Sequence, residues 1–280
     1  MNIIKLKSML EQFYIEDIGD GDLSSDYLFP KSLRGELSFI AKVDGIFCGN
    51  DVIEYGLQVV DDTLSVVCHV EDGDPIERGT VIATASGRIG SLLKSERVIL
   101  NLIQRMSAIA TETNRVVQKI SGTGTKVVDT RKTVPGLRML DKYAIRIGGG
   151  FNHRNGLYDA VMLKDNHLAF AGSISNAVKT VRAAIGHTVK IEVEIESFEQ
   201  LQEAVEAKVD IIMFDNCSPE MIKEWKKSVP GSIITEASGM ITNETIRTYA
   251  ESGVDYISLG YLTHSVKALD ISANVLIETH

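Results

Sequence analysis

The stretch from Asp129 to His167 gathers side chains suited to binding a small anion. Seven cations stand against four carboxylates there, a local charge of +3, whereas the whole chain carries −9. These cations alternate with glycine, asparagine and histidine rather than following a helical period, so a pocket explains them better than a solvated basic helix face. The cations are Arg131, Lys132, Arg138, Lys142, Arg146, Arg154 and Lys164, accompanied by His153 and His167.

Carboxylates follow two apolar runs further along the chain. Glu194 alternates with Glu192 and Glu196, so the three side chains share one strand face, which would point into a barrel. An unpaired buried carboxylate is costly, so a metal-binding or sugar-binding role is favoured over a structural one for Glu194. The same reasoning applies to Asp215, which ends the run IIMFD.

The elements that position these residues are predicted strands and helices in alternation. The last four runs begin at 190, 211, 233 and 256, a spacing that suits minimal βα units and a parallel barrel. Only six such runs are visible, so the barrel is expected to be incomplete; a flat doubly wound sheet is the alternative. In a barrel, the polar ends of the strands would meet at one active-site mouth. The six runs span 126–130, 160–166, 190–196, 211–216, 233–238 and 256–260.

The first part of the chain has a different pattern. Residues 1–14 predict a short amphipathic helix, and 16–26 a loop rich in glycine, aspartate and serine. Extended segments separated by turns between 35 and 86 predict a small antiparallel sheet. A long helix is predicted over 91–120. We therefore expect two domains, 1–110 with the linking helix and 111–280 with the catalytic barrel, whose last helix would pack back on the first domain.

Composition excludes several classes of protein. Lys and Arg total 29 against 38 Asp and Glu, which disfavours a nucleic-acid or membrane-surface binder. The apolar runs are too short to cross a bilayer, and the N-terminus lacks the pattern of a signal peptide, so a cytoplasmic protein is expected. Three cysteines without CxxC spacing indicate small core residues in a reducing compartment.

Common catalytic motifs are missing. The sequence contains no Walker A motif, no intact GxGxxG, no HExxH and no Ser–His–Asp order. The run Gly148-Gly149-Gly150 is typical of a flexible turn, although its backbone amides would be able to approach an anion closely.

One long stretch is recognisable. Residues 129–167, DTRKTVPGLRMLDKYAIRIGGGFNHRNGLYDAVMLKDNH, strongly resemble the signature region of quinolinate phosphoribosyltransferase, also called carboxylating nicotinate-nucleotide pyrophosphorylase. Val134 and Met240 depart from the residues usual in that family, but neither change removes a charged group. Supporting matches run along both halves of the chain, at 16–25, 95–111, 192–197, 214–216, 236–239 and 253–265.

The resemblance implies an activity and a fold. Members join quinolinate to phosphoribosyl diphosphate with Mg²⁺ and no organic cofactor, releasing diphosphate and carbon dioxide and yielding nicotinate mononucleotide for de novo NAD synthesis. The implied α/β fold is an N-terminal α/β sandwich domain followed by an incomplete parallel α/β barrel. The implied assembly is a homodimer or larger homo-oligomer.

The resemblance also assigns roles to residues of this chain. Arg105, Arg131, His153 and Arg154 would hold the quinolinate carboxylates, and Arg suits them because its planar fork binds bidentately. Lys132 and Lys164 would meet the diphosphate, with Lys132, Glu194 and Asp215 as the catalytic residues. Glu194 and Asp215 would bind Mg²⁺ directly or through water and hold the ribose hydroxyls. Thr130 and Met240 complete the substrate site. The 5-phosphate would bind backbone donors at Ser238, Gly239, Ser258, Leu259 and Gly260.

Arg105 stands apart from the other predicted cations. It lies in the long helix, about 25 residues before the first predicted rim residues. The family resemblance implies that this arginine reaches the mouth of a neighbouring subunit's barrel, so that a dimer would be needed for activity. The alternatives are that Arg105 serves its own barrel or faces solvent.

Two other functions are compatible with these sequence features. One is a molybdenum-transport-associated homologue with the same fold and a similar Thr-Arg-Lys loop, whose substrate would differ. The other is a non-catalytic anion-binding module, which would have no need of Glu194 and Asp215 at the mouth. The match at 95–111 and the full set of cations favour quinolinate.

Overall fold

A computed structural model describes residues 1–277 as two compact units. The first unit comprises Met1–Glu112, Met139–Gly148 and the segment that begins at Ser265; the second comprises Thr113–Arg138 and Gly149–His264. Met139–Gly148 lies within the range expected for the barrel domain. None of the helices in residues 1–277 is both long and apolar enough to cross a membrane.

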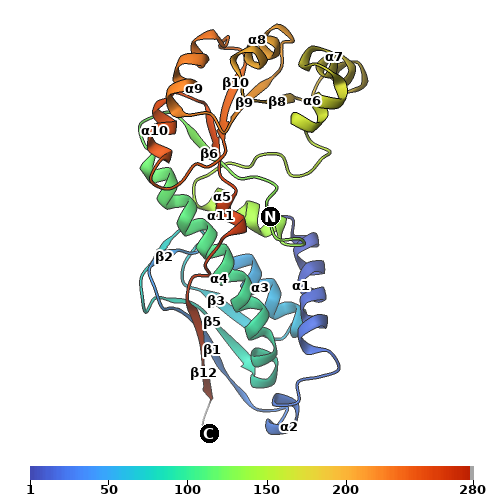
Figure 1. The fold of residues 1–280 in the computed structure, drawn as a ribbon. Coiled ribbons are helices and arrows are strands. Elements are labelled where there is room, and N and C mark those ends of the chain that lie inside the picture. Colours follow the sequence, from blue (N-terminus) through green and yellow to red (C-terminus); the bar gives the residue numbers. More distant parts are fainter. Residues whose placement is uncertain (278–280) are drawn as a thin grey trace. The chain divides into compact units, whose positions relative to one another are not determined.

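The first unit is built on an antiparallel sheet in the order β12-β1-β5-β3 (Figure 1). Side chains alternate between buried and exposed along β1, as a sheet with one covered face requires. Three helices pack closely together beside the sheet: an added Cβ on Gly56 of α3 would lie 2.7 Å from Ile99 of α4, and Tyr14 of α1 donates to the Ser95 carbonyl oxygen of α4. The elements are α1 (Ile3–Ile18), α2 (Ser25–Leu28), β1 (Arg34–Ala41), β2 (Gly45–Ile46), α3 (Asn50–Val60), β3 (Ser65–Cys68), β4 (Pro75–Ile76), β5 (Val81–Arg88), α4 (Ile89–Lys119), α5 (Arg138–Ile147) and β12 (Ile271–Ile277).

Helix α3, helix α5 and strand β12 differ from the expectation. The cations of 129–167 were expected not to follow a helical period, but Arg138, Lys142 and Arg146 lie at intervals of four residues on α5. Helix α3 lies where the sequence indicated only extended segments and turns; Val52, Ile53 and Leu57 form its buried face. The expected last helix is instead strand β12, which pairs antiparallel with β1 from Gly35 to Ala41. β12 satisfies the backbone groups at that edge of β1, which would otherwise be unpaired. The predicted antiparallel sheet and long helix are confirmed.

The second unit is a parallel sheet in the order β6-β11-β10-β9-β8-β7. The strands from β7 to β11 follow one another without reversal, and β6, the first along the chain, pairs with β11. A doubly wound sheet reverses its strand order at a switch point, so this order is that of an incomplete barrel with β6 and β7 as edges. All six predicted strands are confirmed. The elements are β6 (Lys126–Val128), β7 (Val161–Leu163), α6 (Asp165–Ala171), α7 (Ile174–Ala184), β8 (Ile191–Ile195), α8 (Phe198–Glu206), β9 (Ile211–Asp215), α9 (Pro219–Trp225), η1 (Lys226–Ser228), β10 (Ile234–Ser238), α10 (Ile246–Glu251), β11 (Tyr256–Ser258) and α11 (Tyr261–His264).

Local sequence fixes where the helices of this unit begin. The Ser197 hydroxyl accepts a hydrogen bond from Gln200 N, and the Gln200 side chain accepts one from Ser197 N, which forms a capping box at α8. At α9, Ser218 caps the helix and Pro219 occupies its first turn. Each helix therefore starts shortly after a strand ends, which leaves the last residue of the strand at the mouth of the barrel.

Candidate active site

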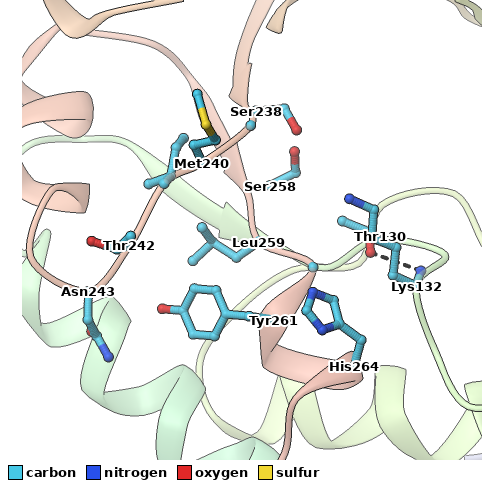
Figure 2. A pocket seen from close by; sticks show the side chains of 13 residues that line it. Thr130, Lys132, Ser238, Met240, Thr242, Asn243, Ser258, Leu259, Tyr261 and His264 are labelled. Carbon is cyan, nitrogen blue, oxygen red and sulfur yellow. Dashed lines mark hydrogen bonds between the residues drawn. The ribbon is translucent and has the colours of Figure 1, made fainter. Parts of the chain in front are cut away.

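Two adjoining pockets lie at the carboxyl ends of the barrel strands. The central pocket has a volume of about 410 Å³ and the rim pocket about 420 Å³, and they share Thr130, Lys132, Ser238 and Ser258. The central pocket is lined by Thr130, Arg131, Lys132, His153, Arg154, Met162, Lys164, Glu194, Met213, Asp215, Glu236, Ser238 and Ser258. The rim pocket, drawn in Figure 2, is lined by Thr130, Lys132, Ser238, Gly239, Met240, Ile241, Thr242, Asn243, Ser258, Leu259, Gly260, Tyr261 and His264.

The predicted site residues assemble in these pockets, with one exception. Each of the fourteen residues predicted from the barrel lines one pocket or both. Arg105 belongs to the first unit, where its guanidinium forms two hydrogen bonds of 2.8 Å to the buried carboxylate of Asp141. Its role toward quinolinate stays a prediction.

The loop after β6 holds Lys132 at the junction of the two pockets. Lys132 N donates to the Thr130 hydroxyl at 3.0 Å, and the Thr263 hydroxyl donates to the Lys132 carbonyl oxygen at 2.8 Å. A Cβ at position 260 would lie 2.8 Å from Lys132 Cδ, so Gly260 makes room for the lysine side chain. The backbone of Lys132 is therefore held at both its N–H and its carbonyl group, which fixes the base of the side chain that carries the ammonium group.

Asp129 fixes the loop that carries His153 and Arg154. Its carboxylate is fully buried and accepts hydrogen bonds from Asn152 Nδ2 at 2.7 Å and from His153 N at 2.8 Å. Phe151 adds a parallel bridge to Val128 of β6. The end of β6 and the loop after α5 are therefore held side by side.

We expect Asp129→Ala to lower the free energy of unfolding by about 1–3 kcal/mol, because buried donors lose their acceptor. Quinolinate affinity should fall as well, since the loop bearing Arg154 is released. Denaturant unfolding and calorimetric titration would measure the two effects. Unchanged stability and affinity would show that the loop holds its position without Asp129.

Arg131 and Arg154 both line the central pocket. Burial lowers the pKa of Arg154, and the positive charge of Arg131 lowers it further. Arg154 donates to the Ala160 carbonyl oxygen and contacts the Met162 sulfur, while the Arg131 Nε is buried without a hydrogen-bond partner. Two arginines in one pocket suit an anion with two carboxylates, since each guanidinium can bind a carboxylate.

Glu194 and Asp215 end neighbouring strands. Glu194 pairs with Lys164, and burial raises the pKa of the Glu194 carboxyl group despite that lysine. Burial also raises the pKa of Asp215, and the positive charges of Lys164 and Lys132 partly offset this increase. His167 accepts a hydrogen bond from Lys164 N at 3.0 Å, so it orders the start of α6. The half-buried carboxylates of Glu194 and Asp215, beside these lysines, offer oxygen ligands suited to a hard cation.

Backbone geometry shapes the rim pocket. Gly239 has φ +91°, and a Cβ there would lie 2.2 Å from Asn216 Oδ1, so only glycine fits. Met240 is also left-handed, with φ +50°, and its side chain is 82% exposed. Leu259 N already donates to the Val128 carbonyl oxygen at 3.0 Å, so this amide is engaged rather than directed at a ligand. Leu259 contributes its side chain to the wall (Figure 2).

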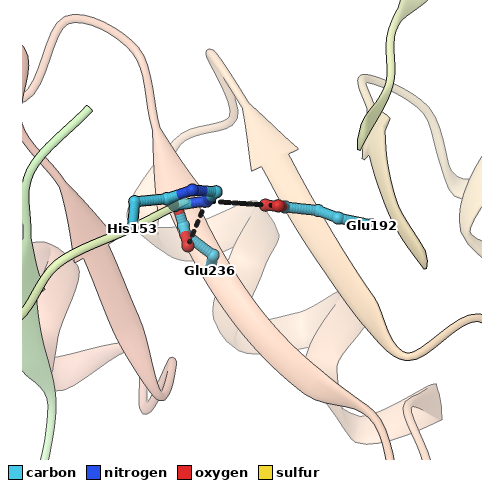
Figure 3. A group of neighbouring side chains, drawn as sticks. All are labelled: His153, Glu192 and Glu236. Carbon is cyan, nitrogen blue, oxygen red and sulfur yellow. Dashed lines mark hydrogen bonds and ion pairs between the residues drawn. The ribbon is translucent and has the colours of Figure 1, made fainter. Parts of the chain in front are cut away.

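A buried cluster beneath the central pocket was not predicted as a site. It consists of His153, Glu192 and Glu236, with Glu192 from β8 and Glu236 from β10 (Figure 3). The strand-face alternation placed Glu192 inside the barrel, but nothing in the sequence paired it with the other two residues. His264 and Tyr261, which line the rim pocket, were also missed as site residues.

Comparisons with known proteins give one consistent result. Residues 22–107 match the model of the quinolinate phosphoribosyl transferase N-terminal domain, and residues 109–274 match that of its C-terminal domain. A Bacillus subtilis protein named "Probable nicotinate-nucleotide pyrophosphorylase (carboxylating)" is 52% identical, covering 98% of this chain and 95% of the relative. A mitochondrial quinolinate phosphoribosyltransferase (decarboxylating) from Nicotiana glauca is 38% identical, covering 96% and 82%. The crystal structure of NadC from Streptococcus pyogenes is 37% identical, with a TM-score of 0.96 over 100% of this chain and 99% of that one.

Proposed function

Because the chain belongs to the quinolinate phosphoribosyltransferase family, we propose that its two pockets join quinolinate to phosphoribosyl diphosphate. The products are nicotinate mononucleotide, diphosphate and carbon dioxide, and the reaction belongs to de novo NAD biosynthesis. The names of the relatives support this activity over that of a molybdenum-transport-associated homologue. A passive anion-binding module would have no need of the two carboxylates, Glu194 and Asp215, that line the central pocket.

The observation that carries the proposal is the pair Arg131 and Arg154. Quinolinate has two adjacent carboxylates, and two arginines that line one pocket would match them in charge. The buried Nε of Arg131 without a partner supports this assignment, because a bound carboxylate would satisfy it. Quinolinate would then relieve the repulsion that depresses the pKa of Arg154.

Purified protein with quinolinate, phosphoribosyl diphosphate and Mg²⁺ should lose quinolinate and form nicotinate mononucleotide, as followed by ultraviolet absorbance and chromatography. Turnover with nicotinate but not quinolinate, or no turnover, would contradict the proposal.

Arg131→Lys and Arg154→Lys are each expected to weaken quinolinate binding more than donor binding, because lysine keeps the charge but loses the planar fork. Loss of one bidentate contact should raise the quinolinate Kd by about 10-fold, at about 1.4 kcal/mol per factor of ten. Separate calorimetric titrations of the two ligands would decide it. Equal weakening of both would mean that these arginines set only the potential of the pocket.

We propose that Mg²⁺ is held at Glu194 and Asp215. The residues fit the ion, since Mg²⁺ commonly uses one or two carboxylates together with substrate phosphates and several waters. The raised pKa values of both carboxyl groups support the assignment, because buried carboxylates are stabilised by a cation. When bound, the ion would neutralise charge on the diphosphate.

The protein's own groups account for the remaining chemistry of transfer. The rim pocket would hold the 5-phosphate, with Ser238, Gly239, Met240 and Gly260 around it. Lys132, between the pockets, would face the diphosphate as negative charge develops on it, and Lys164 would turn from Glu194 to the same group. Attack by the pyridine nitrogen on the anomeric carbon is then promoted by positioning and electrostatics, without a covalent intermediate.

We propose a homodimer in which Arg105 of one subunit completes the site of the other, as the family resemblance implies. We also propose that the protein works in the cytoplasm. Cys48, Cys68 and Cys217 are all free thiols, which fits a reducing compartment. Light scattering and cell fractionation would test these two proposals.

A further inference from the structure

The cluster of His153, Glu192 and Glu236 lies inside the barrel, where it is shielded from solvent. Glu192 is 1% exposed and Glu236 4%. His153 Nε2 lies 3.1 Å from Glu192 Oε2 and 3.5 Å from Glu236 Oε2, so one imidazole nitrogen faces both carboxyl groups (Figure 3). The Oε1 atom of Glu236 is buried without a hydrogen-bond partner.

The tautomer of His153 is determined by its other ring nitrogen. Arg154 N donates a hydrogen bond of 2.8 Å to Nδ1, so Nδ1 carries a lone pair and the single imidazole proton is on Nε2. If Nδ1 also carried a proton, that proton would point at the backbone N–H of Arg154, which needs an acceptor there. His153 therefore donates through Nε2 toward both carboxyl groups.

Two buried carboxyl groups that share one donor are less costly to bury when one of them keeps its proton. Burial raises the pKa of Glu236 to about 7, and the charge of Glu192 contributes in the same direction. His153 opposes this shift, and Glu194 adds to it. A substantial fraction of Glu236 therefore keeps its proton near neutral pH. The other charged groups lining the cavities beside it are Arg131, Lys132, Arg154, Asp159, Lys164, Lys190 and Asp215.

Glu236 has access to two cavities. It lines the central pocket with the paired arginines, and it also lines a basal cavity of about 440 Å³ at the amino ends of the strands. Lys190, Ile211, Ile234 and Tyr256 place that cavity at the opposite end of the barrel, and the exposed Lys190 and Asp159 connect it to solvent. A proton from water can therefore reach Glu236 without crossing a filled central pocket.

We propose that Glu236 is the general acid that protonates the pyridine ring after carbon dioxide leaves, an inference that rests on the proposed function. The bond between ring carbon C2 and its carboxylate breaks, carbon dioxide departs, and the electron pair stays on C2. A C2–H bond then forms as the O–H bond of Glu236 breaks. The resulting carboxylate takes a new proton from water in the basal cavity, with His153 and Glu192 holding it in place.

The same cluster does not fit a metal ion. Ligation through Nε2 requires a lone pair on that atom, whereas the hydrogen bond to Nδ1 places the proton there. Only as an imidazolate, or after the Arg154 contact broke, would His153 bind a cation through this nitrogen. The geometry favours proton transfer.

The test compares pH profiles of nicotinate mononucleotide formation. Wild-type kcat should fall as pH rises through about 7, because the active form of Glu236 is the protonated one. Glu236→Gln preserves shape but carries no transferable proton. It should lower kcat by about 10²-fold, remove the alkaline limb and the solvent deuterium isotope effect, and leave both KM values within about twofold.

A second variant separates catalysis from structure. Glu192→Gln removes the negative neighbour that raises the pKa of Glu236, so its alkaline limb should move to lower pH while its low-pH kcat is retained. If Glu236 had only a structural role, Glu192→Gln would not shift the alkaline limb in this direction. If Glu236→Gln does not fold, the Glu192→Gln profile is sufficient to test the inference. The exposed Glu199, in the first turn of α8, provides a matched control: Glu199→Gln should keep the wild-type profile.

Three results would overturn the inference. They are an unchanged alkaline limb in Glu236→Gln, an unshifted limb in Glu192→Gln, and a stoichiometric metal in the purified protein that Glu236→Gln loses. If the wild-type protein forms no nicotinate mononucleotide at any pH, the proposed function fails, and this inference fails with it. Wild-type turnover with an unaltered variant profile overturns the role of Glu236 alone.

Discussion

Asp215→Ala is expected to lower kcat by about 10²–10³-fold, equivalent to about 2.7–4 kcal/mol of transition-state stabilisation, as when other preorganised electrostatic groups are removed. Asp215 ends β9 at the central pocket, close enough to Lys132 and Lys164 for both to lower its pKa. Its loss leaves the developing diphosphate charge less well neutralised. Steady-state rates over a range of Mg²⁺ concentrations would measure the effect.

Glu194→Ala should have an effect of similar size, with one difference. Glu194 holds Lys164, so its removal also frees that ammonium, and Glu194→Ala with Lys164→Ala should be non-additive. Glu220, exposed in the first turn of α9, offers a matched control, and Glu220→Ala should leave kcat unchanged. If Asp215→Ala retains near wild-type turnover at saturating Mg²⁺, its carboxylate has a structural role.

The sequence predicts the barrel well because its signals are local. Strand runs at intervals of 21 to 23 residues identify βα units, and parallel strands bring their carboxyl ends to one edge. That reasoning places Glu194 and Asp215 together, and both line the central pocket. The cations of the Thr-Arg-Lys loop reach the same pocket because the loop directly follows β6.

Local sequence patterns do not predict contacts that depend on the curvature of the sheet or on pairing between distant parts of the chain. The meeting of His153, Glu192 and Glu236 depends on how far the sheet curls between β8 and β10, which no spacing along the chain encodes. Strand β12 is determined by the edge of β1, more than 200 residues earlier. The partner of Arg105 is Asp141, on a helix 36 residues away. In each case the residues meet only through tertiary structure, whereas sequence periodicity predicts only local secondary structure.

The ion pair between Arg105 and Asp141 leads to the second large effect. Arg105 is 19% exposed and Asp141 is fully buried, so the pair fixes the guanidinium between α4 and α5. Arg105→Ala would leave a buried carboxylate unpaired, at a cost of about 3–5 kcal/mol in stability. Arg105→Lys keeps a cation near Asp141 and removes the fork. It is the variant to use if Arg105→Ala does not fold.

Mixing inactive Arg105 variants with inactive Lys132→Ala subunits tests the proposed shared site. If Arg105 acts across a two-fold interface, both defects of a mixed dimer fall in one site and the other site is intact. Random exchange of equal amounts should then restore about one quarter of wild-type activity, because about half of the subunits enter mixed dimers with one working site of two. Native mass spectrometry would confirm the exchange, and each variant exchanged with itself serves as the control. If mixed dimers form and no activity returns, Arg105 serves its own subunit or only stabilises α4 against α5.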